Sequence, residues 1–150
     1  MISKARAKAI IKGSYKYSDI KGKILFYETY NGVIVAVEIK GLPKGQECSD
    51  PIFAMHIHEG GRCNGSSEDP FADIGMHYNP NNCKHPYHAG DMPSLFSSEG
   101  YALLIFYTNR FKVKDIIGRT VIIHSRPDDY MTQPSGNAGE KIACGVINRY

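Results

Sequence analysis

The chain has 150 residues, a length that predicts a single domain over residues 1–150 with room for a hydrophobic core. Hydrophobic residues make up 42% of the chain and charged residues 22%, as is typical of a globular protein. The formal net charge of +3 comes from lysines and arginines that are spread along the chain, so nothing indicates a nucleic-acid partner. Such a mild positive field weakly suits a small anionic ligand.

No stretch of the sequence is long and apolar enough to span a membrane, and no apolar signal core follows Met1. We therefore expect no membrane association and a cytoplasmic location. An exported protein whose signal peptide had been removed and replaced by a new initiating methionine would have the same N-terminal sequence. An extracellular or cell-surface location is therefore the alternative.

The dominant period of the sequence is two, beginning with Ala5, Ala7 and Ala9, which alternate with basic residues. This alternation predicts half-buried strands. The pair Asn31-Gly32 is a strong hairpin signal because both residues tolerate positive φ. In chain order, strands are expected over residues 5–11, 24–29, 33–39, 53–58, 101–107, 120–124 and 142–147.

Two long segments, residues 59–98 and 125–141, are rich in Gly, Asn, Asp and Pro and interrupt this pattern. No segment of the chain shows a convincing helical period. Short strands with Gly and Pro between them predict an all-β fold, either an antiparallel sandwich or a barrel. Irregular segments of this length are uncommon in a compact domain, so we expect the two loops to carry function.

All six histidines fall between positions 56 and 124, which is more crowding than packing requirements explain. His56 and His58 lie in a predicted strand, where residues i and i+2 point to the same face. Both imidazoles can therefore bind one ion. The alternative is a pair of solvent-facing histidines on an exposed strand face.

Four potential metal ligands, His77, His85, His88 and Asp91, lie in the first long loop. Ordering a loop costs about 1–2 kcal/mol of backbone entropy per residue, and a bound metal offsets this cost. Three imidazoles and one carboxylate form a closed tetrahedral donor set, which suits zinc. The alternative is a polar, mobile loop that is rich in histidine by chance.

His124 ends the apolar run Val121-Ile122-Ile123, where a histidine is more often packed or exposed than a ligand. The interpretation of His124 as a ligand is favoured for two reasons. Several imidazoles with one open coordination position suit copper, and His56 and His58 need further ligands to complete such a site. Once His124 joins these two and the loop donors are assigned to zinc, only His77 remains for both sites. His77 would then bind both ions through its two ring nitrogens, as an imidazolate.

Six segments form a recognisable pattern by their order and approximate spacing: Ile39-Lys40-Gly41-Leu42, MHIHEGG (55–61), GMHYNP (75–80), KHPYHAGD (84–91), IIGRTVIIH (116–124) and GNAGEKIACGVI (136–147). With them the chain resembles the copper/zinc superoxide dismutase family over nearly its whole length. The resemblance implies a Greek-key antiparallel β-sandwich or flattened barrel of about eight strands with two long functional loops. It also implies an enzyme that converts superoxide to dioxygen and hydrogen peroxide with copper and zinc as cofactors.

The resemblance assigns site residues by position. The residues that correspond to the family's copper ligands are His56, His58, His77 and His124, and those that correspond to its zinc ligands are His77, His85, His88 and Asp91. Asp128 corresponds to an aspartate that accepts a ring N–H from one histidine at each metal; the alternative is an ordinary turn residue. Cys63 and Cys144 correspond to the intradomain disulfide of the family.

Lys141 marks a departure from the family, which places an arginine beside the copper at this position. A lysine still attracts an anion but lacks the planar fork of arginine, so we expect slower turnover with the chemistry retained. The expected catalytic residues are therefore His77, which exchanges a proton, and Lys141, which attracts superoxide. The alternative for Lys141 is a solvated loop lysine.

Cys48 and Cys83 have no counterpart in the family. They either form a second disulfide or remain free thiols, and their spacing does not decide between the two. The alternative function is a non-catalytic copper/zinc-binding module on the same fold, used for storage or delivery. A homodimer is one of the assemblies compatible with the sequence.

Overall fold

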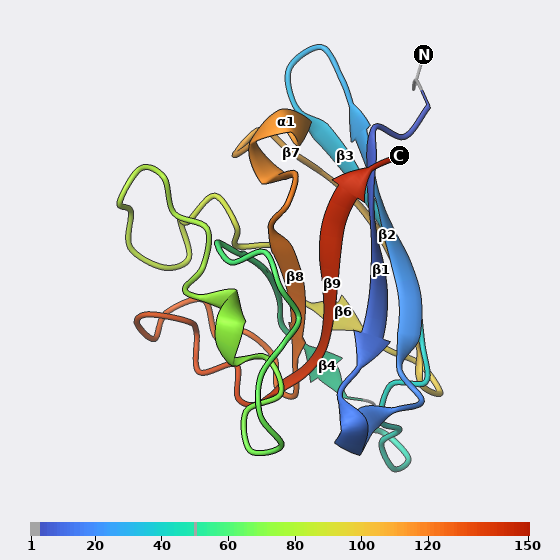
Figure 1. Ribbon diagram of the computed structural model, residues 1–150. Helices are drawn as coiled ribbons and strands as arrows, with labels where there is room; N and C mark the ends of the chain where they lie inside the picture. The colour runs from blue at the N-terminus through green and yellow to red at the C-terminus, as the bar shows by residue number, and fades with distance from the viewer. Residues whose placement is uncertain (1–3, 50) are drawn as a thin grey trace.

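The computed structural model describes residues 4–49 and 51–150, and the regular secondary structure of these residues is almost entirely antiparallel strand (Figure 1). In chain order the strands are β1 (Ala7–Gly13), β2 (Lys21–Glu28), β3 (Val33–Lys40), β4 (Ile52–Phe53), β5 (Met55–His58), β6 (Leu95–Phe96), β7 (Tyr101–Thr108), β8 (Thr120–His124) and β9 (Lys141–Arg149). Seven of them form one curled sheet, a half-barrel with the order β5-β8-β9-β1-β2-β3-β7. The two others, β4 and β6, pair with each other. The predicted all-β fold is confirmed.

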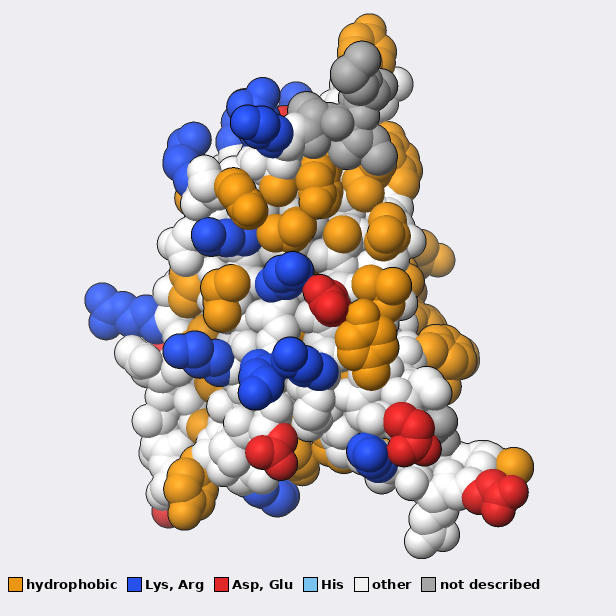
Figure 2. All heavy atoms as spheres, turned by 90° about the vertical axis from the view of Figure 1, so that its right-hand side faces the viewer, with side chains coloured by type: hydrophobic (Ala, Val, Ile, Leu, Met, Phe, Trp, Pro, Cys, Tyr) orange, Lys and Arg blue, Asp and Glu red, His pale blue; other side chains and the backbone are white. Residues whose placement is uncertain are grey.

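The alternation in the sequence places one face of each long strand in the core. Along β3 the residues Val33, Val35, Val37 and Ile39 are fully buried, while β2 and β7 pair with β3 on its two sides. The other face of β1, β2, β3 and β7 is largely open to solvent, whereas β5 and β8 are buried on both faces. Figure 2 shows this outer surface, where hydrophobic side chains lie among lysines and arginines.

The hairpin predicted at Asn31-Gly32 connects β2 to β3, but its turn has a different geometry from the one expected. Neither residue is among the positions with positive φ in the described part of the chain. Instead, Thr29 closes a four-residue loop, because its backbone N–H and its hydroxyl both donate to the carbonyl of Gly32 at 2.8 Å. A side chain at position 32 would meet the carbonyl oxygen of Thr108 at 2.4 Å, so close approach to the end of β7 requires glycine here.

The strand predicted over residues 53–58 is in fact two strands that belong to different sheets. Ala54 separates β4 from β5: its N–H donates to the carbonyl of Arg126, and its own carbonyl accepts the N–H of His124. The partner of β4 is β6, which lies inside a segment predicted to be a loop. Strands of two residues are too short to show a period, so no pattern in the sequence predicts this small sheet.

The described residues also contain three short helical turns, which are η1 (Tyr15–Tyr17), η2 (Ala72–Ile74) and α1 (Val113–Ile116). Each spans about one turn, which explains why no helical period is visible in the sequence. The two long irregular segments both lie on the side of the sheet where β8 and β9 run (Figure 1). They thus surround the end of the sheet that carries the histidines.

Candidate metal centre

β5 is an edge strand of the curled sheet, and the first long loop completes this edge. Ile57 donates its N–H to the carbonyl of Gly90 and accepts the N–H of Tyr78, both at 2.8 Å. A Cβ at position 90 would lie 2.2 Å from the carbonyl oxygen of Ile57, so the loop approaches this closely only with glycine. The backbone therefore docks the loop histidines beside the histidines of β5.

The first group of donors combines His56 and His58 from β5, His77 from the loop and His124 from the end of β8. One potential ligand atom of each lies within 4.8 Å of those of the others, and all four side chains are buried. The loops cover β5, so the alternative of solvent-facing histidines at positions 56 and 58 is wrong. Met55 and Ile57 point the other way, into the hydrophobic core.

The hydrogen bonds of these histidines fix which ring nitrogen is available to a metal. His56 uses Nε2 to donate to Asp128 Oδ2 at 2.7 Å, and His58 uses Nδ1 to donate to the carbonyl of Gly75 at 2.9 Å. The opposite nitrogens have no hydrogen-bond partner although they are buried; they are His56 Nδ1, His58 Nε2, His77 Nε2 and His124 Nε2. Buried polar atoms are rarely left unpaired, so four converging lone pairs fit a bound cation.

The second group consists of His77, His85, His88 and Asp91, which likewise offer atoms within 4.8 Å of one another. His77 Nδ1 lies 2.8 Å from one carboxylate oxygen of Asp91, and His85 Nδ1 lies 3.1 Å from the other. The Nδ1 atoms of His77 and His88 are 3.3 Å apart. Three nitrogens and one carboxylate that crowd around one point form a closed donor set of the kind that suits zinc.

His77 belongs to both groups. Its Nδ1 lies among the second group, while its Nε2 is buried without a partner beside the first. The ring stacks on that of His56 with 4.0 Å between the centroids, and a β-bridge joins His77 to His58. One imidazole thus presents one nitrogen to each group.

Asp128 connects the two groups through the ring nitrogens that face away from the donor atoms. Its Oδ2 accepts the Nε2–H of His56 at 2.7 Å, its Oδ1 accepts the Nε2–H of His85 at 2.8 Å, and Oδ1 also accepts the backbone N–H of Tyr130 at 2.7 Å. Burial by itself would raise the pKa of Asp128, but these hydrogen bonds lower it to about 2. The carboxylate therefore stays ionised and keeps the Nδ1 atoms of both histidines free for a metal.

Gly136 packs directly against this carboxylate. A Cβ at this position would lie 1.9 Å from Asp128 Oδ1 and 2.7 Å from His85 Nε2, and the φ of Gly136 is +71°. Both the space and the left-handed backbone require glycine here. The second long loop thus closes over the back of the site.

Burial lowers the pKa of four of the six histidines in the absence of metal. The pKa values of His56, His58 and His88 fall below the usual 6.5, and burial, with the neighbouring charge of His56, lowers that of His124 to about 3. The unfolded chain therefore takes up protons near pH 6.5 that the folded chain does not, so stability decreases as the pH falls.

We expect the free energy of unfolding of the metal-free protein to decrease below pH 6.5, by about 1.4 kcal/mol per pH unit from His124 alone down to its folded pKa of about 3. Urea unfolding in the presence of a chelator, at several pH values between 7.5 and 4.5, measures this loss. A constant urea midpoint between pH 7 and pH 5 would contradict the prediction. Asp128 adds its own loss in the same direction only below about pH 4.

Arg110 fixes the segment that carries the second group. Its Nη1 donates to the carbonyl of Pro86 at 2.7 Å and lies 3.4 Å and 3.5 Å from the carbonyl oxygens of His88 and Asp91. We expect Arg110→Ala to lower the free energy of unfolding by about 1–2 kcal/mol and to speed amide hydrogen exchange in residues 86–91. Arg126→Ala is the control, because this exposed arginine contacts Asn137 instead.

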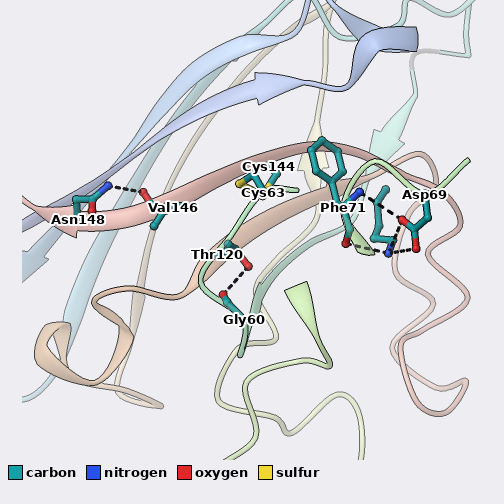
Figure 3. The surroundings of a disulfide bond; sticks show 9 residues. Gly60, Cys63, Asp69, Phe71, Thr120, Cys144, Val146 and Asn148 are labelled. Carbon is teal, nitrogen blue, oxygen red and sulfur yellow. Dashed lines mark hydrogen bonds and ion pairs between the residues drawn. A yellow bond between two sulfur atoms is a disulfide. The ribbon is translucent and has the colours of Figure 1, made fainter. Parts of the chain in front are cut away.

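Lys141, the predicted cation, is not free. Its Nζ lies 2.8 Å from Asp69 Oδ1 and donates to the carbonyl of Phe71 at 3.2 Å. Figure 3 shows Asp69 and Phe71 where the loop meets β9. Sequence reasoning did not find Asp69, because 72 residues separate it from Lys141 and no motif connects the two.

The disulfide implied by the resemblance is present. Cys63 in the first loop and Cys144 in β9, 81 residues apart, are bonded (Figure 3). Cys48 and Cys83 are both free and exposed, so no second disulfide joins them in the structure. The loop is therefore tied covalently to the strand at one point.

Comparison with known proteins identifies the family. The family model for copper/zinc superoxide dismutase (SODC) matches residues 20–147. Superoxide dismutase [Cu-Zn] 2 of Aquifex aeolicus is 36% identical over 144 residues, which cover 86% of this chain and 80% of the relative. The corresponding enzyme of Deinococcus radiodurans is 33% identical over 86% of this chain and 80% of its own length.

A relative from a vertebrate is similar over an even larger share of both chains. Superoxide dismutase [Cu-Zn] A of Xenopus laevis is 31% identical over 95% of this chain and 96% of its own length. Among the residues that the structure describes, no helix is long and apolar enough to cross a membrane. The match of the family model, the identity to these relatives and the curled antiparallel sheet agree, and the chain belongs to the copper/zinc superoxide dismutase family.

Proposed function

We propose that this protein is a superoxide dismutase that binds copper and zinc at the two histidine groups. The copper ligands are His56, His58, His77 and His124, and the zinc ligands are His77, His85, His88 and Asp91. The observation that carries the proposal is the placement of one imidazole, His77, with Nδ1 in one group and an unpaired Nε2 beside the other. A packing histidine has no need of this arrangement, whereas two cations joined by one imidazolate do.

Two superoxide ions and two protons give one dioxygen and one hydrogen peroxide. When bound, copper supplies the one-electron exchange with superoxide, and zinc supplies a fixed positive charge. The chain must supply the protons at a defined position. His77 is the member of the first group whose other ring nitrogen lies in the second group, so its buried, unpartnered Nε2 is the nitrogen that could take up and release a proton there while Nδ1 stays held. Asp91 and His88 hold the opposite nitrogen in place.

The test is a superoxide-decay assay on protein reconstituted with copper and zinc, with both metals quantified in the same sample. We expect decay far above that of the zinc-only protein and of an equal amount of free copper treated with chelator. His77→Ala should lose most of this activity even at equal copper content. A protein that retains both metals and leaves superoxide untouched would instead be a module for metal storage or delivery.

A further inference from the structure

The ammonium group of Lys141 is surrounded by acceptors from the first long loop. Its Nζ lies 2.8 Å and 2.9 Å from the two carboxylate oxygens of Asp69 and 3.2 Å from the carbonyl oxygen of Phe71. A lysine has three N–H donors, so these contacts use most of its hydrogen-bonding capacity. Only 27% of the Lys141 side chain remains exposed. The charge of Lys141 is thus largely paired before any anion arrives.

The loop holds Asp69 firmly in this position. Its backbone N–H donates to the hydroxyl of Ser66 at 3.1 Å, and its own side chain lies 3.4 Å from the N–H of Phe71. The ring of Phe71 is buried in a small cluster that includes Ile122 and Cys144, beside the disulfide (Figure 3). The backbone on both sides of Asp69 is therefore anchored, and the half-exposed carboxylate reaches Lys141 from this anchored segment.

Lys141 is also close to the first histidine group. In the register of β8 and β9 it is the partner of His124, which is a member of that group. A free cation at this position would attract an anion towards the group. A carboxylate at 2.8 Å from the ammonium opposes that attraction.

We propose that Asp69 is a positioning residue that holds and partly neutralises Lys141, and that it thereby limits the attraction of small anions to the first histidine group. For superoxide as the anion, the proposal rests on the proposed function. Removal of the carboxylate charge should raise the second-order rate constant about threefold to tenfold at low ionic strength. The gain should shrink at about 150 mM salt, where the screening length falls to about 8 Å.

The experiment compares Asp69→Asn, Asp69→Glu and the control Glu68→Gln in the copper- and zinc-loaded protein at equal metal content. Glu68 is the exposed neighbour of Asp69, so its replacement changes the net charge equally. We expect Asp69→Asn to react faster at low salt, and both other variants to stay near the parent rate. In the background of Lys141→Met, Asp69→Asn should give no gain. An equal gain from Glu68→Gln, or one that persists without Lys141, would overturn the proposal, because net charge alone would then explain it.

Two further measurements do not depend on superoxide turnover. Azide serves as a non-reacting anion whose affinity for the loaded protein is followed by titration of the visible spectrum, and Asp69→Asn should tighten it by a similar factor. Acylation of Lys141, followed by mass spectrometry of its peptide in the protein as purified, should also become faster. If loaded protein consumes no superoxide while both measurements respond, the proposed function fails and the pairing of Lys141 stands. Unchanged azide affinity and acylation would refute the pairing.

Discussion

Replacement of Asp128 by alanine is expected to lower the affinity of the protein for both copper and zinc, by about 10- to 100-fold each. The reason is that one carboxylate accepts the Nε2–H of His56 and the Nε2–H of His85. Without it, two buried N–H groups lose their acceptor, and each ring can move its proton to the nitrogen that should face the metal. Competition against a chelator of known affinity measures the effect for each metal.

Asp128→Asn refines this test. An amide has one acceptor oxygen, so it can hold only one of the two histidines in the correct tautomer, and the affinity for one metal should fall more than that for the other. Asp129→Asn is the matched control, because this exposed carboxylate accepts hydrogen bonds only from the nearby Thr132 and Met131 among the contacts described. Equal affinities in Asp128→Ala and the parent protein would show that the carboxylate does not orient the ligands.

Loss of the Cys63–Cys144 disulfide is expected to lower the free energy of unfolding of the metal-free protein by about 4 kcal/mol, since the bond closes a loop with a sequence separation of 81 residues. The cross-link restricts the unfolded chain, and a loop of this length restricts it strongly. Urea unfolding of the double variant Cys63→Ser/Cys144→Ser measures the loss.

The chain carries its own control for this experiment. Cys48 and Cys83 are exposed and free, so the double variant Cys48→Ser/Cys83→Ser removes the same number of sulfur atoms without opening a loop. Its unfolding midpoint should match that of the parent protein. A loss below about 1 kcal/mol in the Cys63/Cys144 variant would mean that the metal-free chain gains little from the cross-link.

The sequence predicted those parts of the fold that depend on a regular pattern of neighbouring residues. The alternating valines of β3 and the hairpin at residues 29–32 follow from patterns within ten residues. The break at Ala54 does not, because hydrogen bonds to Arg126 and from His124, both far along the chain, create it. Likewise, β4 and β6 consist of two residues each and exist only through their mutual pairing.

The same distinction applies to the site. The crowded histidines and the i, i+2 spacing of His56 and His58 were visible because the chemistry of the residue type marks them. The partners that fix them were harder to find. Asp128 was identified only through the resemblance to the family. Arg110 and Asp69 were missed, because neither an arginine that binds backbone carbonyls nor an aspartate that pairs with a distant lysine leaves a recognisable motif in the sequence.

Two of the contacts between the loop and β9 act as ties, the Cys63–Cys144 bond and the contact of Asp69 with Lys141. A single tie would act as a pivot and leave the loop free to swing about it. A second tie, three residues away on the strand and six on the loop, removes that rotation. The loop segment therefore cannot turn relative to the strand without separating two opposite charges, and its orientation is set as well as its distance.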